Sequence, residues 1–215
     1  MNMLMCSKWI VLGALVLLPG LAEAQPYATP RVAIGAGGGV AFPLHGDFDF
    51  TPWAWEADAR VALSRHVLFE VAVGEWRRSE TRVVENIQLT MPAGVIGRLE
   101  TTTTRVQRTW QANLLFTGAS GRVRVTGGGG VGVLQHERET RQVLSDCSSG
   151  VACNASGSEF SNGSGSAQVL GGTEVRLAGG LAVYGQVRFI VPMTDPGGSD
   201  FRVTSGVRWS FGRVR

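Results

Sequence analysis

The chain has 215 residues, a formal net charge of +3 at pH 7, 30 glycines and 3 cysteines. This length fits one domain, and so mild and evenly spread a charge argues against a nucleic-acid-binding protein. After the first 24 residues no apolar run is long enough for a transmembrane helix and helical periodicity is hard to find, so the composition indicates an exported all-β protein.

Residues 1–24 have the pattern of a secretory signal peptide. Lys8 supplies a positive charge, residues 9–18 form an apolar run, and Ala22-Glu23-Ala24 matches a small-x-small cleavage site. The apolar run is too short to cross a bilayer as a helix. We therefore expect removal of residues 1–24, including Cys6, and a mature domain of residues 25–215.

Eight stretches of the mature chain alternate between apolar and polar residues with the period of a β-strand. Each has about ten residues, the length that a tilted strand needs to cross the hydrocarbon layer. They cover residues 31–41 and 53–64, a run that begins near residue 67, a run that ends at residue 117, and residues 122–133, 167–177, 182–191 and 201–211.

The connections between these stretches alternate in length. Three are tight, at residues 64–66, 118–121 and 178–180, and the other four are long and polar. Short turns at one end and long loops at the other are typical of outer-membrane barrels. The long loops at 77–108 and 137–165 contain the β-prone segments 82–84 and 101–105, which we expect to extend the flanking strands.

The last strand carries the pattern polar-x-Gly-x-x-aromatic-x-Phe at Thr204, Gly206, Trp209 and Phe211. It resembles the insertion signal at the end of bacterial outer-membrane β-barrels, although residues 212–215 follow where the family usually stops. Over nearly all of its mature length the chain resembles the small eight-stranded barrels of the OmpA-like, OmpX/Ail and opacity-protein kind. The resemblance implies an all-β fold: an eight-stranded antiparallel up-and-down transmembrane barrel in the outer membrane of a Gram-negative-type bacterium.

Threading the strands up and down sorts the aromatic residues into two groups, which match the two interfaces of a bilayer. In lipid an open sheet edge leaves unpaired backbone groups that cost several kcal/mol each, so the first and eighth strands must pair. The expected belts are Phe42, Trp53, Trp55, Trp110, Phe189 and Phe201 at the long-loop end, and Phe69, Phe116, Trp209 and Phe211 at the short-turn end.

The opposite faces of the strands carry charged residues, which closure places inside the barrel. Side chains fill a barrel of eight strands, and charges in so dry an interior are costly unless they are paired. We expect a structural salt-bridge network with Arg60–Glu70 and Arg124–Glu174 as neighbours; an ion path or gate is the alternative, and a wide pore is excluded. The residues are Glu56, Asp58, Arg60, Glu70, Arg124, Glu174, Arg176, Arg188, Arg202 and Arg208.

Other motifs give little sign of chemistry. Cys147 and Cys153 are expected to form a disulfide in an oxidising compartment, since two cysteines without a nearby histidine pair make a poor metal site. The glycine runs at 35–39 and 127–130 lack the remaining residues of phosphate-binding loops and indicate strand curvature and space for inner side chains. No serine shares a strand face at suitable spacing with His45, His66 or His136, except Ser64 beside His66 in a tight turn, so no catalytic site or cofactor is predicted.

The resemblance implies a non-enzymatic surface protein for envelope integrity or adhesion, acting through its extracellular loops. A narrow channel for small solutes and a lipid-modifying enzyme are the alternatives. Expected partners are outer-membrane lipid and lipopolysaccharide, the barrel-assembly machinery and a surface or host ligand, with the protein a monomer. Anionic lipopolysaccharide could meet the loop residues Arg77, Arg78, Arg138 and Arg141, although simple solvated charge explains these arginines equally well.

Overall fold

A computed structural model describes residues 31–44, 52–90, 93–147, 155–194 and 199–212. In these residues no helix is long and apolar enough to span a bilayer. Every strand pairs antiparallel with its neighbours in sequence, and β1 also pairs with β8, which closes the barrel. The strands are β1 (Val32–Pro43), β2 (Trp53–Ala62), β3 (Val67–Thr90), β4 (Ala93–Ser120), β5 (Val123–Cys147), β6 (Ala155–Arg176), β7 (Leu181–Pro192) and β8 (Asp200–Phe211).

The closing pair runs the full length of both strands, from Val32 opposite Phe211 to Pro43 opposite Asp200. The predicted class, an eight-stranded antiparallel up-and-down barrel, is therefore confirmed. The short connections between β2 and β3, β4 and β5, and β6 and β7 lie where the sequence placed them. Gly121, Gly179 and Gly180 have positive φ angles of 57°, 56° and 88°, a conformation that glycine adopts without the steric cost of a Cβ.

The barrel wall has a polar inner face and an apolar outer face. In β7, for example, buried Tyr184, Gln186 and Arg188 alternate with exposed Val183 and Val187. In a water-soluble protein this arrangement would be inside out, because it buries charge and exposes large apolar side chains. It is the distribution that a hydrocarbon solvent requires, so the outer face is the surface in contact with lipid.

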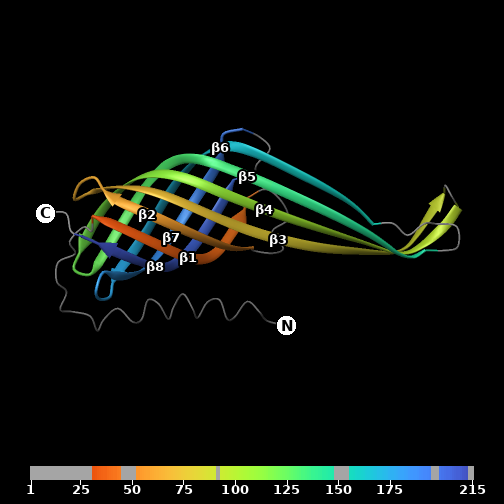
Figure 1. The fold of residues 1–215 in the computed structure, drawn as a ribbon, viewed down its shortest axis with the longest axis horizontal. Coiled ribbons are helices and arrows are strands. Elements are labelled where there is room, and N and C mark those ends of the chain that lie inside the picture. The colour runs from red at the N-terminus through yellow and green to blue at the C-terminus, as the bar shows by residue number, and fades with distance from the viewer. Residues whose placement is uncertain (1–30, 45–51, 91–92, 148–154, 195–198, 213–215) are drawn as a thin grey trace.

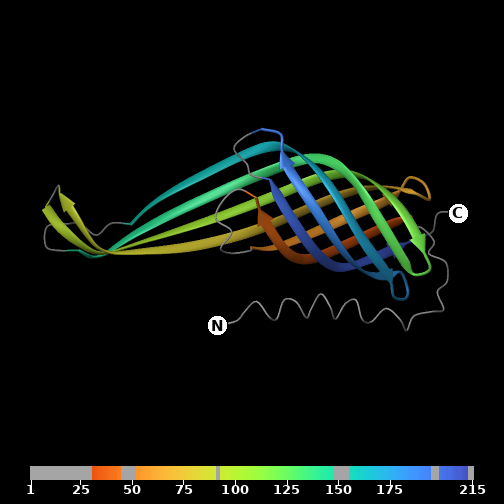
Figure 2. The same ribbon diagram turned by 180° about the vertical axis from the view of Figure 1, so that it is seen from behind.

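The strands fall into two length classes. β1, β2, β7 and β8 have 10–12 residues, whereas β3, β4, β5 and β6 have 24, 28, 25 and 22. The four longer strands continue beyond the barrel as a twisted sheet on the side away from the short turns (Figures 1 and 2). We call this sheet, residues 78–90, 93–106, 137–147 and 155–165, the extension.

The extension corrects one prediction. Residues 77–108 and 137–165 were expected to be long loops, lengthened only locally by β-prone segments. Instead, β3 and β4 pair as far as Thr90 opposite Ala93, and β5 and β6 pair as far as Val143 opposite Ala155. Threonines and arginines are compatible with a paired strand whose two faces are both in water, but such a strand has no apolar stripe for a periodicity argument to detect.

Candidate functional site: the barrel interior and the extension

Ten charged side chains are buried inside the barrel, and their formal charges cancel. Five arginines face five carboxylates among the described residues, and each of the ten side chains is at most 5% exposed. An uncompensated charge at this depth would carry a large desolvation penalty, so the balance is a condition for a stable barrel. The ten are Arg60, Arg124, Arg188, Arg202 and Arg208 with Glu56, Asp58, Glu70, Glu174 and Asp200.

Nearest the short turns, Arg208 organises a cluster. Its Nε and Nη2 donate to the two carboxylate oxygens of Asp58 at 3.1 and 2.9 Å, and its Nη1 donates to Glu174 at 2.7 Å. The ring of Tyr184 lies 4.1 Å from the guanidinium carbon, in the geometry of a cation–π contact. Arg124 approaches Glu174 at 3.9 Å, so one of the two expected pairs is a loose contact.

Halfway along the barrel, Glu70 accepts hydrogen bonds from three side chains. Arg60 Nε donates to Glu70 at 2.7 Å, and Arg60 Nη2 forms an ion pair with it at 2.6 Å. Arg188 donates to Glu70 at 2.9 Å and Asn113 at 2.8 Å. Arg188 also donates to Glu56 at 3.0 Å, and Gln186 donates to Glu56 as well. The second expected pair, Arg60 with Glu70, is thus a close contact within a larger network.

Near the extension, Asp200 holds a third cluster that the sequence reasoning missed. Its Oδ2 accepts hydrogen bonds from Arg202 at 2.7 Å, from Trp76 at 3.1 Å and from Gln107 at 3.2 Å. Arg202 donates to Thr109 at 3.2 Å. Asp200 is the first residue of β8 and follows a polar connection, whereas the sequence predicts this strand only from residue 201; the strand parity of Asp200 with Arg202 is the available signal.

Two other differences concern the predicted interior. Arg176 has the inward parity of β6 but lies at the end of the strand and is partly exposed, and it contributes to none of the ion pairs described above. Neutral polar residues do much of the hydrogen bonding between the charges, and they were not predicted. They include Gln107, Gln111, Asn113, Gln168 and Gln186, all at most 5% exposed.

The aromatic residues assigned to the two belts lie on the outer face. Trp53 is 78% exposed and Phe116 61%, and Phe42 and Phe201 meet with their ring centres 6.1 Å apart. At the other end Trp209 and Phe211 are outward neighbours with ring centres 6.5 Å apart, while Thr204 and Gly206 of the same strand face inward. The terminal pattern therefore combines two lipid-facing aromatics with inward polar and small residues.

The described histidines and cysteines that the sequence analysis considered as chemical sites form no catalytic arrangement. The ring Nδ1 of His66 lies 3.3 Å from the carbonyl oxygen of Thr117, and only its backbone N–H approaches the Ser64 hydroxyl. In the described part of the chain no three His, Cys, Asp or Glu side chains are grouped to hold a metal ion. His45 and Cys153 lie outside the described residues, and the structure describes Cys147 only as the end of the β5 backbone, so the disulfide stays a prediction.

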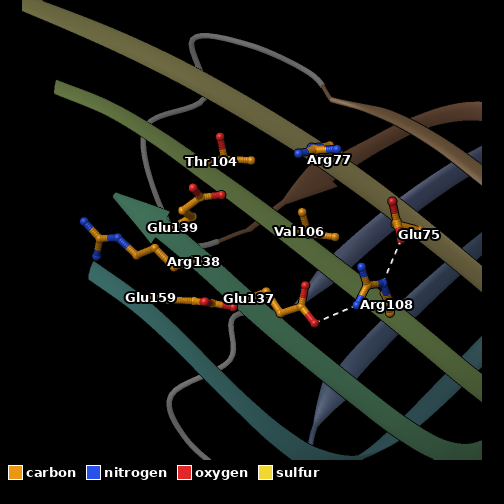
Figure 3. Close-up of a pocket in the computed structure, with 9 residues that line it drawn as sticks. All are labelled: Glu75, Arg77, Thr104, Val106, Arg108, Glu137, Arg138, Glu139 and Glu159. Atoms are coloured by element: carbon orange, nitrogen blue, oxygen red, sulfur yellow. Dashed lines mark hydrogen bonds and ion pairs between the residues drawn. The ribbon is translucent and has the colours of Figure 1, made fainter. Parts of the chain in front are cut away.

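Where the barrel meets the extension, the outer face of the sheet carries a row of ion pairs, which we call the Arg108 ladder. Arg108 donates to Glu75 at 2.9 Å and to Glu137 at 2.6 Å, which links β3, β4 and β5 (Figure 3). The hydrogen bond that Arg108 donates to Glu75, together with the charge of Glu137, raises the pKa of the Arg108 guanidinium above its usual range. The ladder borders a cavity of about 120 Å³ that Arg77, Arg138, Glu139 and Glu159 also line.

A closed barrel with a lipid-facing outer wall and a neutralised charged interior is a transmembrane β-barrel, and the protein is located in the outer membrane. Its fold is the closed eight-stranded antiparallel barrel that the sequence pattern indicated. No protein-family model matches the chain, and no curated protein matches it either.

Similar solved structures include outer-membrane barrels with little sequence identity to this chain. Ail of Yersinia pestis, solved with the heparin analogue sucrose octasulfate, is 11% identical, with 83% of this chain and 96% of Ail covered and a TM-score of 0.47. Neisserial surface protein A is 12% identical, with coverages of 84% and 96% and a TM-score of 0.48. The N-terminal barrel of Pseudomonas aeruginosa OprF is 10% identical, with coverages of 87% and 100% and a TM-score of 0.40. At this similarity no residue role is transferred to this chain.

Proposed function

We propose that this protein is a non-enzymatic surface protein that binds an external partner through its extension. The observation that supports the proposal is the difference in strand length. Strands of 10–12 residues suffice to cross the membrane in β1, β2, β7 and β8, yet β3 to β6 continue for about as many residues again. With a rise of about 3.3 Å per residue, the described part of β3 beyond Arg77 reaches ~40 Å.

Within the described residues the extension has two edges without a paired strand: β2 pairs with β3 no further than Arg77, and β7 pairs with β6 no further than Ser166. Unpaired strand edges offer backbone donors and acceptors to a further strand. Val83, Val84 and Phe160 are 41%, 40% and 57% exposed beside these edges, so apolar contact surface accompanies the hydrogen-bonding groups.

The interior supports a structural role for the barrel in preference to a channel. Several ion pairs described above join strands that are not neighbours in the sheet: Arg208 of β8 pairs with Asp58 of β2, and Arg188 of β7 reaches across the barrel to Glu70 of β3. Passage of an ion would require several of these buried pairs to separate in a medium of low dielectric constant. The barrel therefore serves as a rigid anchor, and the extension carries the contact surface.

The proposal is tested by shortening the extension. One variant joins Arg77 to Val106 and Glu137 to Ser161, which are opposite one another in the sheet, by two-residue turns, so that the membrane-spanning barrel is retained. Bacteria displaying the intact or the shortened protein are then compared for attachment to cultured cells and to extracellular matrix, with barrel folding checked by heat-modifiable migration on a denaturing gel. We expect the shortened protein to fold and attachment to be lost. Unchanged attachment would refute the proposal.

A second measurement addresses the enzyme alternative. Lipid A from cells that express the protein is analysed by mass spectrometry, alongside lipid A from cells that express a His66→Ala or His136→Ala variant. We expect identical lipid A in all three cases. A mass change that depends on either histidine would establish a lipid-modifying activity instead.

A further inference from the structure

We propose that a row of three arginines across the extension, Arg78, Arg105 and Arg138, binds the sulfate or phosphate esters of an anionic carbohydrate from outside the cell. This inference rests on the proposed function, since it specifies the class of ligand that the extension takes. It follows from the strand register, from the charge on the two faces of the sheet and from the side chains around the row.

The register places the three arginines directly beside one another. Arg78 of β3 is opposite Arg105 of β4, and Arg105 is opposite Arg138 of β5. Residues directly opposite in antiparallel strands share a face and lie about 5 Å apart, so the three side chains originate within roughly 10 Å. The pairing has no bulge between the barrel and this row, so the row is on the face that continues the inner wall.

Like charges directly opposite one another destabilise a sheet unless something neutralises them. Arg78 has a partner in Glu80, at 3.3 Å. Arg105 and Arg138 are exposed, and within the described residues neither has a carboxylate at ion-pair distance. Arg138 borders the cavity beside the Arg108 ladder, and its side chain extends away from that ladder in Figure 3. An oxyanion between these guanidinium groups would convert mutual repulsion into charge-assisted hydrogen bonds.

The two faces of the extension have opposite charge over the same stretch. From Arg78 to Arg82 and across the paired strands, the inner face carries four arginines and one glutamate, a net charge of +3. The outer face from Arg77 to Val83 carries two arginines and four glutamates, a net charge of −2. The inner charges are Arg78, Arg82, Arg105, Arg138 and Glu80; the outer charges are Arg77, Arg141, Glu100, Glu137, Glu139 and Glu159.

The surroundings of the row are those of a carbohydrate site. Phe160 of β6 continues the row beyond Arg138 and is 57% exposed, which offers an apolar ring for the flat face of a sugar. On the same face towards the tip, Thr103 and Thr140 are opposite one another, and Thr101 is opposite Gln142. Hydroxyl and amide groups next to guanidinium groups provide hydrogen bonds to sugar hydroxyls and ester oxygens.

The arginine row lies next to a buried, hydrogen-bonded row of the barrel. The preceding row of the inner face contains Trp76 and Gln107, which are 6% and 1% exposed and both donate to Asp200. These buried hydrogen bonds fix the backbone from which the arginines project. A fixed spacing of charged groups lowers the ordering cost of binding.

The two faces also distinguish the possible sources of the ester groups. The lipopolysaccharide that surrounds the barrel meets the outer wall, and above that wall the extension presents the glutamate-rich face, which repels phosphate. The arginine row is on the opposite face and looks over the mouth of the barrel. The structure therefore favours a glycan from outside over the lipid of the protein's own membrane.

The test uses the full-length protein in nanodiscs made of phospholipid alone, with dextran sulfate as the probe and unsulfated dextran as its uncharged match. The variant Arg105→Gln/Arg138→Gln removes two charges from the row. The control Arg77→Gln/Arg141→Gln removes two exposed arginines from the outer face of the same strands, so that both variants change the net charge equally. The protein is titrated with each probe at several salt concentrations, and the fraction of protein with bound probe is measured.

We expect dextran sulfate to bind, dextran not to bind, and the row variant to weaken binding roughly tenfold, the scale of losing two exposed ion pairs. The control should bind within about twofold of the unmodified protein. Equal weakening by both variants would show a general charge effect and overturn the inference. Row-dependent binding found only when lipopolysaccharide replaces the phospholipid would overturn the external source.

The inference and the proposed function fail separately. If the shortened extension abolishes cell attachment while the row variant attaches normally and binds dextran sulfate normally, the extension is the contact surface but the arginine row is not the site. If shortening leaves attachment intact, the proposed function fails irrespective of the result with dextran sulfate.

Discussion

Replacing Glu70 by glutamine tests whether the interior is held together by charge balance. Glu70 is 0% exposed and accepts hydrogen bonds from Arg60, Arg188 and Asn113 at 2.7–2.9 Å. Glutamine preserves the shape but removes the charge and directs an NH₂ group at donors. The interior is left with an uncompensated positive charge, so we expect Glu70→Gln to lower the free energy of unfolding by ~3–5 kcal/mol.

The measurement is urea unfolding of the barrel in lipid vesicles under reversible conditions, followed by tryptophan fluorescence. The control, Glu100→Gln, removes a carboxylate from an exposed pair with Arg98 at 3.4 Å and should cost at most about 1 kcal/mol. Adding Arg60→Gln to Glu70→Gln restores neutrality, because one positive and one negative charge have then been removed. The other carboxylates near Arg60, which are Asp58 and Glu174, retain Arg208 as a partner. The double variant should therefore lose less unfolding free energy than the sum of the losses in the two single variants. A loss below about 1 kcal/mol for Glu70→Gln would refute the reasoning.

Three further predictions follow from the same structure. The purified protein should give no resolved current steps in planar bilayers; steps whose size changes in Arg188→Ala would contradict a filled interior. His136 lies just beyond the lipid-facing part of β5. Burial lowers the pKa of His136, although the negative charge of Asp200 opposes this shift. Its unfolded form therefore binds the proton more readily, so stability should fall as the pH drops below about 6.5, and His136→Gln should lack that part of the decline between pH 7.5 and 5. At Gly35 a Cβ would lie 2.6 Å from the Asp58 carboxylate, so Gly35→Ala should cost ~1–3 kcal/mol in urea unfolding, whereas Gly118→Ala, where a Cβ meets nothing within 4 Å, should cost little.

The sequence allowed the barrel itself to be predicted because lipid imposes strict period-2 patterning on every membrane-crossing strand. The closing pair of β1 and β8 followed from the cost of an open edge in hydrocarbon, and the neighbours Arg60 and Glu70 followed from inward parity on adjacent strands. These inferences need only local pattern and one global constraint.

The parts that escaped prediction lack such a constraint. The extension is wetted on both faces, so nothing in its sequence alternates between apolar and polar, and it resembled a loop. Asp200 was hidden because it begins a strand just after a polar connection. The bonds that cross the barrel, such as those of Arg188 with Glu56 and Glu70, depend on side-chain reach over the lumen, which strand order alone does not give.

The pairing of β3 to β6 is continuous from the barrel as far as Glu85 opposite Arg98, and this has a mechanical consequence. A partner that pulls on this part of the extension along the strand direction loads the inter-strand hydrogen bonds in shear, so that many of them share the force at the same time. The tension then passes without a hinge into the part of the sheet that is embedded in lipid. A surface protein built in this way resists tearing at the point where a flexible tether would yield first.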